Sequence, residues 1–216
     1  MLRFFYLLAS CLSFNIPKNY VQYNNIKFLY RNLYNIKENN NYSLEHVVPQ
    51  SIFKKKYFNY TRDMHNIILY PLKMNNHRSN YKYVDDFNFY FDSILLDKFG
   101  NKLCNSNYQN NLLYNDVCIK TNSKKIFHPC DIYKGQIARA TMYFATTYPE
   151  FKNDVFDKVI DPDDILNWHY KFPVTKFEKE KNKIVNEIQG NRNIYVSHPS
   201  LLNINLLFFN FFKYKR

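Results

Sequence analysis

The chain has 216 residues, a length that fits one ordinary domain with enough sequence for a hydrophobic core. Lysine and arginine outnumber aspartate and glutamate by 30 to 18, and the resulting net charge of +12 attracts polyanions such as nucleic acids. The four cysteines include no CxxC pair, which argues against a cysteine zinc site. Codon bias in an A/T-rich genome also enriches lysine, asparagine, tyrosine and phenylalanine, so composition alone supports a nucleic-acid partner only weakly.

Residues 1–14, MLRFFYLLASCLSF, have the layout of a cleavable secretory signal peptide. Arg3 precedes a short apolar stretch, and the small residues Ala9 and Ser10 follow it. The stretch is too short for a membrane-spanning helix, and a buried amino-terminal helix is the alternative. If residues 1–14 are a signal peptide, residues 15–216 are expected to function outside the cell or in the periplasm. An intracellular protein is the alternative.

Three cysteines lie in the body of the chain, at Cys104, Cys118 and Cys130. One disulfide is compatible with this set, and we expect Cys104 to pair with Cys118 if it forms. Three free thiols are the alternative, because sequence alone does not give the connectivity.

A strand, a second strand and a short helix are predicted in the first half of the chain. The first strand covers residues 44–48 and stops at Pro49, which cannot donate to a ladder. The apolar run at residues 67–69 predicts the second strand, which ends at Pro71. Residues 72–80 then predict a short polar helix.

Helices are predicted on both sides of this unit. An earlier helix follows from apolar residues at helical spacing, namely Ile26, Leu29, Tyr30 and Leu33. Three later helices are marked by Pro149 after the first, Asp161-Pro162 before the second, and Thr175 with Glu178 before the third, which ends at Gly190. Residues 84–125 predict only small strands or loops, and residues 201–216 predict a packed apolar tail.

The segment EHVVPQS carries the first candidate catalytic residues, Glu45 and His46. Neighbours on a strand point to opposite faces, so the two can serve one site only if the strand ends there. A neutral histidine can take a proton from water, and oxygens of Glu45 and of Asn75, 30 residues on, suit a hard cation such as Mg²⁺. The alternatives are a surface strand end and a loop asparagine.

Other polar residues allow two interpretations each. The arginines could bind phosphates through bidentate contacts or lie solvated on the surface; they include Arg62, Arg78, Arg139 and Arg192. His65 and Asn66 could serve the site, and they are equally compatible with a buried histidine beside a residue that caps a turn.

Six blocks in this order resemble the endonuclease I family of periplasmic or secreted, non-specific nucleases. The resemblance runs from Leu44 to Pro199 and is interrupted at residues 84–125. The blocks are EHVVPQS, DMHNI, NNHRSN, KGQIARATMYF, ILNWHYKFPVTKFE, and IQGNRN followed by His198-Pro199.

The resemblance implies a site that hydrolyses phosphodiester bonds. His46 becomes the general base, Glu45 becomes a metal ligand, and the first asparagine of the N-x-x-R-S-N block, Asn75, becomes the second ligand. The implied cofactor is Mg²⁺, with Mn²⁺ or Ca²⁺ as substitutes, and the implied substrate is DNA, with RNA as an alternative.

The resemblance also suggests residues that bind nucleic acid. Arg78 and Asn80 match later positions of the same block, where holding the helix and binding a phosphate are both expected roles. Arg62 is our choice for the arginine that steadies the cleaved phosphate, although its motif is not clear in this chain.

The chain departs from the family pattern in its helical part, at Gln136, Lys181 and Ile194. These departures motivate an alternative, a nucleic-acid-binding protein of the same fold whose catalysis has decayed. The retention of all three proposed site residues favours the enzyme.

Together these patterns predict one α+β domain at residues 15–216. A ββα-metal finger at about residues 44–80 packs on a mainly helical scaffold at about residues 134–190. The predicted function is a Mg²⁺-dependent endonuclease with little sequence specificity and without a membrane span.

Overall fold

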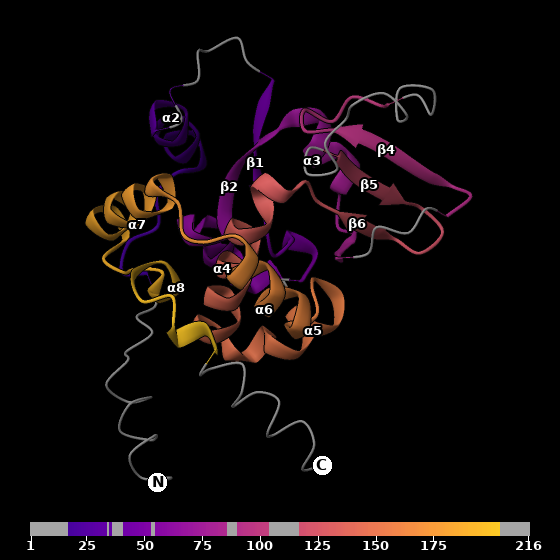
Figure 1. Ribbon diagram of the computed structural model, residues 1–216. Coiled ribbons are helices and arrows are strands. Elements are labelled where there is room, and N and C mark those ends of the chain that lie inside the picture. Colours follow the sequence, from indigo (N-terminus) through magenta and orange to yellow (C-terminus); the bar gives the residue numbers. More distant parts are fainter. Residues whose placement is uncertain are drawn as a thin grey trace, which may run out of the picture.

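The computed structural model describes residues 17–33, 35, 41–52, 55–85, 90–103 and 117–203 (Figure 1). The predicted signal at residues 1–14, and the predicted tail beyond residue 203, lie outside these ranges. Within them, no helix is both long and apolar enough to cross a membrane. Helices and short strands both occur, and the protein is a single α+β domain, as the sequence predicts.

The elements follow the order α2 (Tyr23–Leu33), β1 (Tyr42–His46), η1 (Gln50–Ile52), η2 (Lys55–Arg62), η3 (Met64–Asn66), β2 (Ile67–Pro71), α3 (Leu72–Arg78), β3 (Lys82–Tyr83), β4 (Ser93–Asp97), β5 (Val117–Thr121), β6 (Ile126–His128), α4 (Asp131–Thr147), η6 (Pro149–Phe151), α5 (Lys152–Lys158), α6 (Pro162–Lys171), α7 (Lys176–Gln189) and α8 (Ile194–Ser197). The η elements are 3₁₀ helices. Helix α2 confirms the early helix that apolar spacing predicts.

Strands β1 and β2 with helix α3 form a ββα unit, which carries the proposed site residues. The strands pair antiparallel, with His46 opposite Ile67, and α3 follows β2 directly and packs on both strands. β1 ends at His46, two residues before the predicted end. Beyond His46, hydrogen bonds to Asn66 take the place of the bonds between the strands. The backbone N–H groups of Val47 and Val48 donate to the carbonyl and the side-chain oxygen of Asn66, at 3.0 and 2.8 Å.

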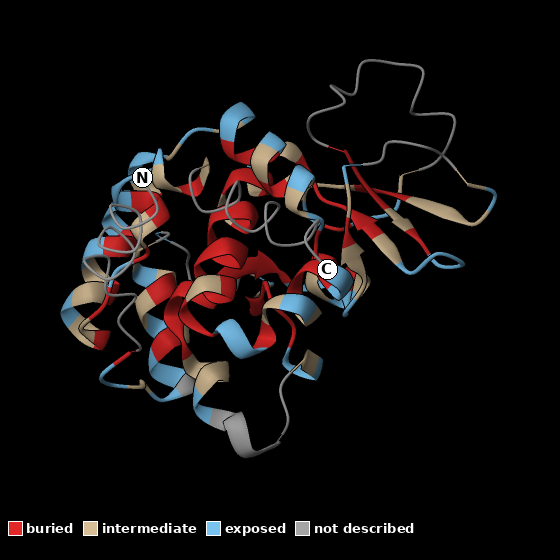
Figure 2. Cartoon of the chain, turned by 90° about the horizontal axis from the view of Figure 1, so that it is seen from below, coloured by how far each residue is buried: buried red, intermediate tan, exposed pale blue. Residues whose placement is uncertain are grey.

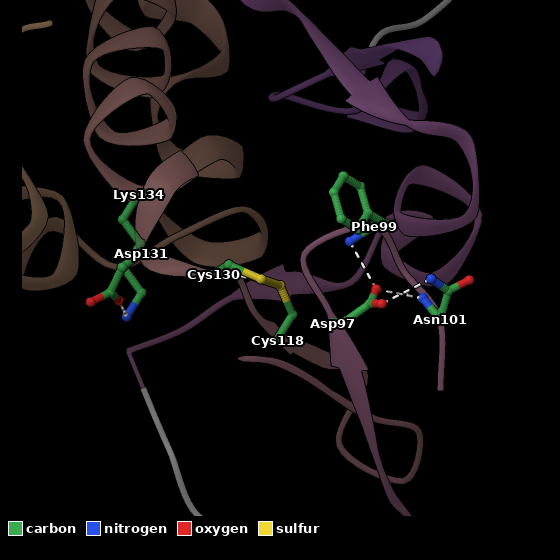
Figure 3. The surroundings of a disulfide bond; sticks show 7 residues. All are labelled: Asp97, Phe99, Asn101, Cys118, Cys130, Asp131 and Lys134. Carbon is green, nitrogen blue, oxygen red and sulfur yellow. Dashed lines mark hydrogen bonds and ion pairs between the residues drawn. A yellow bond between two sulfur atoms is a disulfide. The ribbon is translucent and has the colours of Figure 1, made fainter. Parts of the chain in front are cut away.

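Residues 84–125, for which the sequence predicts only small strands or loops, contribute β4 and β5 to a second sheet of order β3-β6-β5-β4. A disulfide between Cys118 of β5 and Cys130, just before α4, ties this sheet to the helical part (Figure 3). The expected pairing of Cys104 with Cys118 is therefore wrong. The antiparallel pairing of β5 with β6 brings Cys118 and Cys130 together, and this pairing cannot be predicted from the spacing of the cysteines.

The helical scaffold has the termini that its sequence predicts. At the start of α7, Thr175 and Glu178 form a reciprocal capping box, with bonds of 3.1 Å between each side chain and the other's backbone N–H. Gly190 ends α7 in the left-handed conformation, with φ +77°. Asp161 is the N-cap of α6, but its carboxylate accepts from Lys82 Nζ at 2.7 Å in place of a capping bond.

Two apolar clusters hold the ββα unit from opposite sides. Helix α4 is buried almost all round, and the buried, red ribbon lies at the centre of the molecule in Figure 2. Together with Trp168 of α6, this helix forms the main core. Ile68 and Tyr70 of β2 belong to this core, whereas Ile67 and Leu69 belong to a second cluster with α2 and α7. Burial of both faces explains why β2 is a continuous apolar run.

Candidate active site

Glu45 lies near the end of β1 and is 3% exposed. Its Oε1 accepts two hydrogen bonds, from Arg78 Nη1 at 2.8 Å and from the Tyr83 hydroxyl at 3.1 Å. Among the described residues, nothing donates to Oε2. Burial raises the pKa of Glu45 to about 7, with Arg78 as the main opposing influence, so a further cation beside the carboxylate would favour its charged form.

Asn75 of α3 is bonded to the two residues that precede Glu45 in β1. Its Nδ2 donates to Ser43 Oγ at 2.9 Å and to the Leu44 carbonyl at 3.1 Å. Because a carbonyl oxygen can only accept, these contacts fix the nitrogen end of the amide. No described residue donates to Oδ1, so this oxygen is available to a ligand.

The two available oxygens, Oε2 of Glu45 and Oδ1 of Asn75, fit a hard divalent cation. Mg²⁺ prefers oxygen ligands and keeps several waters, so one carboxylate and one amide are a sufficient protein contribution. In the described ranges, no group of three or more histidine, cysteine, aspartate or glutamate side chains is arranged to hold a metal. An amide and a carboxylate oxygen are donors that suit Mg²⁺ better than a metal that needs several nitrogen or sulfur ligands.

His46 is the last residue of β1, which satisfies the condition that the strand must end for both neighbours to serve one site. Its Nε2 lies 2.6 Å from the Thr61 carbonyl oxygen. Since that oxygen can only accept, Nε2 carries the hydrogen and Nδ1 keeps a lone pair. Burial lowers the pKa of His46, which favours the neutral ring that a general base requires.

Gln50, in the 3₁₀ turn after β1, borders the ring of His46. Its Nε2 lies 3.4 Å from Nδ1 and 3.3 Å from Nε2 of the imidazole. Only the contact with Nδ1 joins a donor to an acceptor, because the other ring nitrogen already donates to Thr61. Gln50 is exposed, so an incoming water can replace its amide at Nδ1.

Arg78 is 1% exposed and holds the corner at the end of β1. Besides Glu45, its guanidinium donates to the carbonyls of His46 at 3.0 Å and Val47 at 2.8 Å, and it lies 4.3 Å from the ring centre of Tyr83. Of the two roles that the sequence allows, these contacts support holding the unit together. A buried guanidinium whose two Nη groups are both bonded within the protein is poorly placed to bind a phosphate.

Arg62 and Asn80 border the site without a described role in it. Arg62 is half-buried at the end of η2 and directly follows Thr61, whose carbonyl orients His46. Asn80 is exposed in the turn after α3. Their binding of phosphate or nucleic acid stays a prediction.

A buried polar network around Asp63 supports the ββα unit, and no pattern in the sequence indicates it. The Asp63 carboxylate accepts from the hydroxyls of Tyr143 and Tyr148, both at 2.8 Å, and from Gln189 Nε2 at 3.1 Å. His65 is buried beside it and bonds the Asn191 carbonyl at 3.1 Å. His65 is thus a buried histidine, as one interpretation of the sequence has it, but the residue that caps the turn is Asp63, which accepts from the backbone N–H of His65 at 2.9 Å. Asn66 instead fixes the backbone after β1 through its bonds with Val48.

Two charged residues hold α7 in place, one by binding α4 and the other by binding the ββα unit. Glu178 accepts two bonds from Arg139, at 2.7 and 2.8 Å, with both side chains buried. Lys181 donates to the carbonyl of Ile67 at 2.6 Å, on the strand residue that pairs with His46. Lys181, one of the positions at which the chain departs from the family pattern, therefore makes a structural contact.

Replacing Lys181 with methionine should flatten the pH dependence of stability. Burial lowers the pKa of Lys181 to about 7. Above that pH the unfolded chain, with its ordinary lysine pKa near 10.4, holds a proton that the native chain lacks, so stability should rise with pH by up to about 1.4 kcal/mol per unit. Urea unfolding between about pH 6 and 9.5 should show this rise in the wild type and lose it in Lys181→Met.

The exposed Lys183, on the same helix, supplies the control for that experiment. Lys183→Met should retain the wild-type slope of unfolding free energy against pH. Equal slopes for Lys181→Met and the wild type would show that this lysine is not responsible.

Comparison with known proteins places this arrangement in a family. The sequence profile described as Endonuclease I matches residues 15–200. The chain belongs to the endonuclease I family. This confirms the resemblance seen in the sequence.

Two relatives carry the name Endonuclease-1 in strains of the bacterium Buchnera aphidicola. The chain is 30% identical over 190 residues to the protein of the subspecies Acyrthosiphon pisum, covering 78% of this chain and 66% of that one. It is 28% identical over 184 residues to the protein of the subspecies Baizongia pistaciae, covering 76% and 66%. The match thus spans just under two thirds of the length of these relatives.

Proposed function

We propose that this chain is a metal-dependent endonuclease that hydrolyses phosphodiester bonds of DNA, with RNA as an alternative substrate and with little sequence preference. Membership of the endonuclease I family supports a nuclease. The net charge of +12 supports a substrate that is bound through its phosphates. Contacts to phosphates position a nucleic acid without reading its bases.

The observation that carries the proposal is the contact of 2.6 Å between Nε2 of His46 and the Thr61 carbonyl oxygen. A ring that donates from Nε2 to Thr61 has Nδ1 as its basic nitrogen, and the same bond fixes the orientation of the ring. In the proposed reaction, Nδ1 takes the proton of the attacking water while the bond to Thr61 keeps the ring in place. A general base needs one nitrogen that accepts the proton, and a hydrogen bond from the other nitrogen that holds the ring in place.

In the proposed enzyme, Oε2 of Glu45 and Oδ1 of Asn75 would hold one Mg²⁺, with Mn²⁺ or Ca²⁺ as substitutes. Such an ion would stabilise the charge that develops on the phosphate and the leaving oxygen. Arg78 keeps the carboxylate and the backbone around His46 in position. Arg62 and Asn80 contribute contacts to the substrate backbone.

Incubation of the purified chain with supercoiled plasmid tests this function. We expect nicked and then linear DNA with Mg²⁺, and intact plasmid when EDTA replaces the metal. Binding of plasmid without nicking under both conditions would instead support the decayed, binding-only protein.

A further inference from the structure

A second concave site lies at the opposite end of the ββα unit from His46. Its cavity has a volume of about 330 Å³, enough for the base and sugar of a nucleotide. The lining comes from the start of β1, the end of β2, the first turn of α3 and the turn after β4, and consists of Asn41, Tyr42, Pro71, Lys73, Phe99 and Asn101. The proposed cleavage chemistry uses none of these residues.

The turn after β4 is held rigidly in place against α3. The Asp97 carboxylate accepts from the backbone N–H groups of Phe99 and Asn101 at 2.9 and 2.8 Å, and from Asn101 Nδ2 at 2.8 Å (Figure 3). Gly100, with φ +83°, packs so closely that a Cβ there would lie 2.5 Å from the backbone nitrogen of Met74. Only glycine combines this conformation with this approach, so the cavity wall is preformed.

The cavity combines an aromatic face with positive charge. Phe99 is 51% exposed, and the Nζ of Lys98 lies 5.8 Å from the centre of its ring. Lys73 donates to Asn101 Oδ1 at 2.7 Å, and its ammonium has two further N–H groups.

An aromatic ring beside a lysine suits one ligand class, a nucleotide. Any base can stack on an aromatic side chain, and such stacking is worth about 1–3 kcal/mol per base. A lysine ammonium binds the adjoining phosphate as a point charge. Neither contact depends on base identity, which agrees with a nuclease of little sequence preference.

The spacing between the cavity and His46 suits one continuous nucleic-acid strand. Tyr42 precedes His46 by four residues of β1, a distance of roughly 13 Å along a strand. At about 3.4 Å per step, this corresponds to roughly four nucleotides of a helical strand.

We propose that this cavity binds a nucleotide of the substrate, roughly four positions from the cleaved bond. Phe99 stacks on its base and Lys73 binds its phosphate. The subsite rests on the proposed nuclease function and gives a role to residues 84–125, for which the sequence suggests none.

Anisotropy titrations of a fluorescein-labelled 20-nucleotide single-stranded DNA test the subsite. All variants carry His46→Ala and are measured in EDTA, so that nothing is cleaved. Phe99→Ala should weaken binding by about 5- to 150-fold, the equivalent of one lost stack, without changing the salt dependence. Lys73→Ala should instead reduce the slope of log affinity against log salt by about 0.7, the value for one phosphate contact.

Two exposed residues elsewhere serve as controls. Phe91, 98% exposed before β4, does not line the cavity, and Lys158 lies on α5 with its partner Asp154. Phe91→Ala and Lys158→Ala should bind within twofold of the His46→Ala parent. Loss of affinity in Phe99→Ala, with the affinity of Phe91→Ala and Lys158→Ala unchanged, supports the subsite.

The possible outcomes separate this inference from the function on which it rests. Wild-type protein that nicks plasmid, together with unchanged DNA affinity in Phe99→Ala, would overturn the subsite and leave the nuclease intact. Wild-type protein that neither binds nor nicks DNA would overturn both. An equal loss in Phe91→Ala and Phe99→Ala would also overturn the subsite, because it would indicate general contact with aromatic residues.

Discussion

Replacing His46 with alanine should reduce plasmid nicking by about 10²- to 10⁴-fold, while DNA affinity stays within about twofold of wild type. The reason is that Nδ1 of His46 is the only group assigned to take the proton of water. His46→Gln refines the test, because its amide can still donate to the Thr61 carbonyl but cannot act as a base. Both variants should therefore lose cleavage to a similar degree.

The exposed His198 provides the control for this loss. His198→Ala should nick plasmid at the wild-type rate, measured from the decay of the supercoiled form with Mg²⁺. Nicking at the wild-type rate by His46→Ala would show that another group accepts the proton. Substantial recovery in His46→Gln would show that the ring mainly fixes the backbone.

Replacing Glu178 with alanine should lower the free energy of unfolding by about 3–5 kcal/mol. The substitution leaves the buried guanidinium of Arg139 without its carboxylate, which is costly because a lone charge is poorly solvated in the interior. It also removes one half of the capping box with Thr175. For a chain of this size, thermal unfolding should shift down by roughly 6–20 °C.

Glu180, which is exposed on the same helix, is the appropriate control. Glu180→Ala should change the unfolding free energy by less than about 0.5 kcal/mol. The double variant Arg139→Met with Glu178→Met should recover much of the loss, since a buried pair is often replaceable by apolar side chains. A similar small effect for Glu178→Ala and Glu180→Ala would contradict a structural role for the pair.

Sequence patterns predict those parts of the fold in which one residue type has a strong local consequence. Pro49 marks the approach to the end of β1, and Thr175 with Glu178 marks the start of α7. Gly190 ends that helix because only glycine adopts its backbone conformation without strain. Each of these effects acts within a few residues, so a single sequence is sufficient to detect it.

Contacts between distant segments are the part that the sequence does not predict. Tyr83 reaches Glu45 across 38 residues, and Cys118 meets Cys130 through the pairing of β5 with β6. The short strands of the second sheet have no periodicity of their own. Their stability comes from neighbours that lie far away in the chain, which is why residues 84–125 could not be placed.

The candidate site shows the same division. Glu45, His46 and Asn75 are chosen from residue type and resemblance, and the structure places all three in one ββα unit. The partner that orients His46 is the backbone carbonyl of Thr61, and a carbonyl has no signature in a sequence. Burial of Arg78 is equally hidden, because arginine is a surface residue in most proteins.

The disulfide between Cys118 and Cys130 gives the second sheet a fixed attachment to α4. At the other end of this sheet, Tyr83 of β3 is bridged to Ile160, and its hydroxyl donates to Glu45. The second sheet is therefore attached covalently to α4 and through a hydrogen bond to β1. The carboxylate of Glu45 thus depends for its orientation on a residue that lies outside the ββα unit.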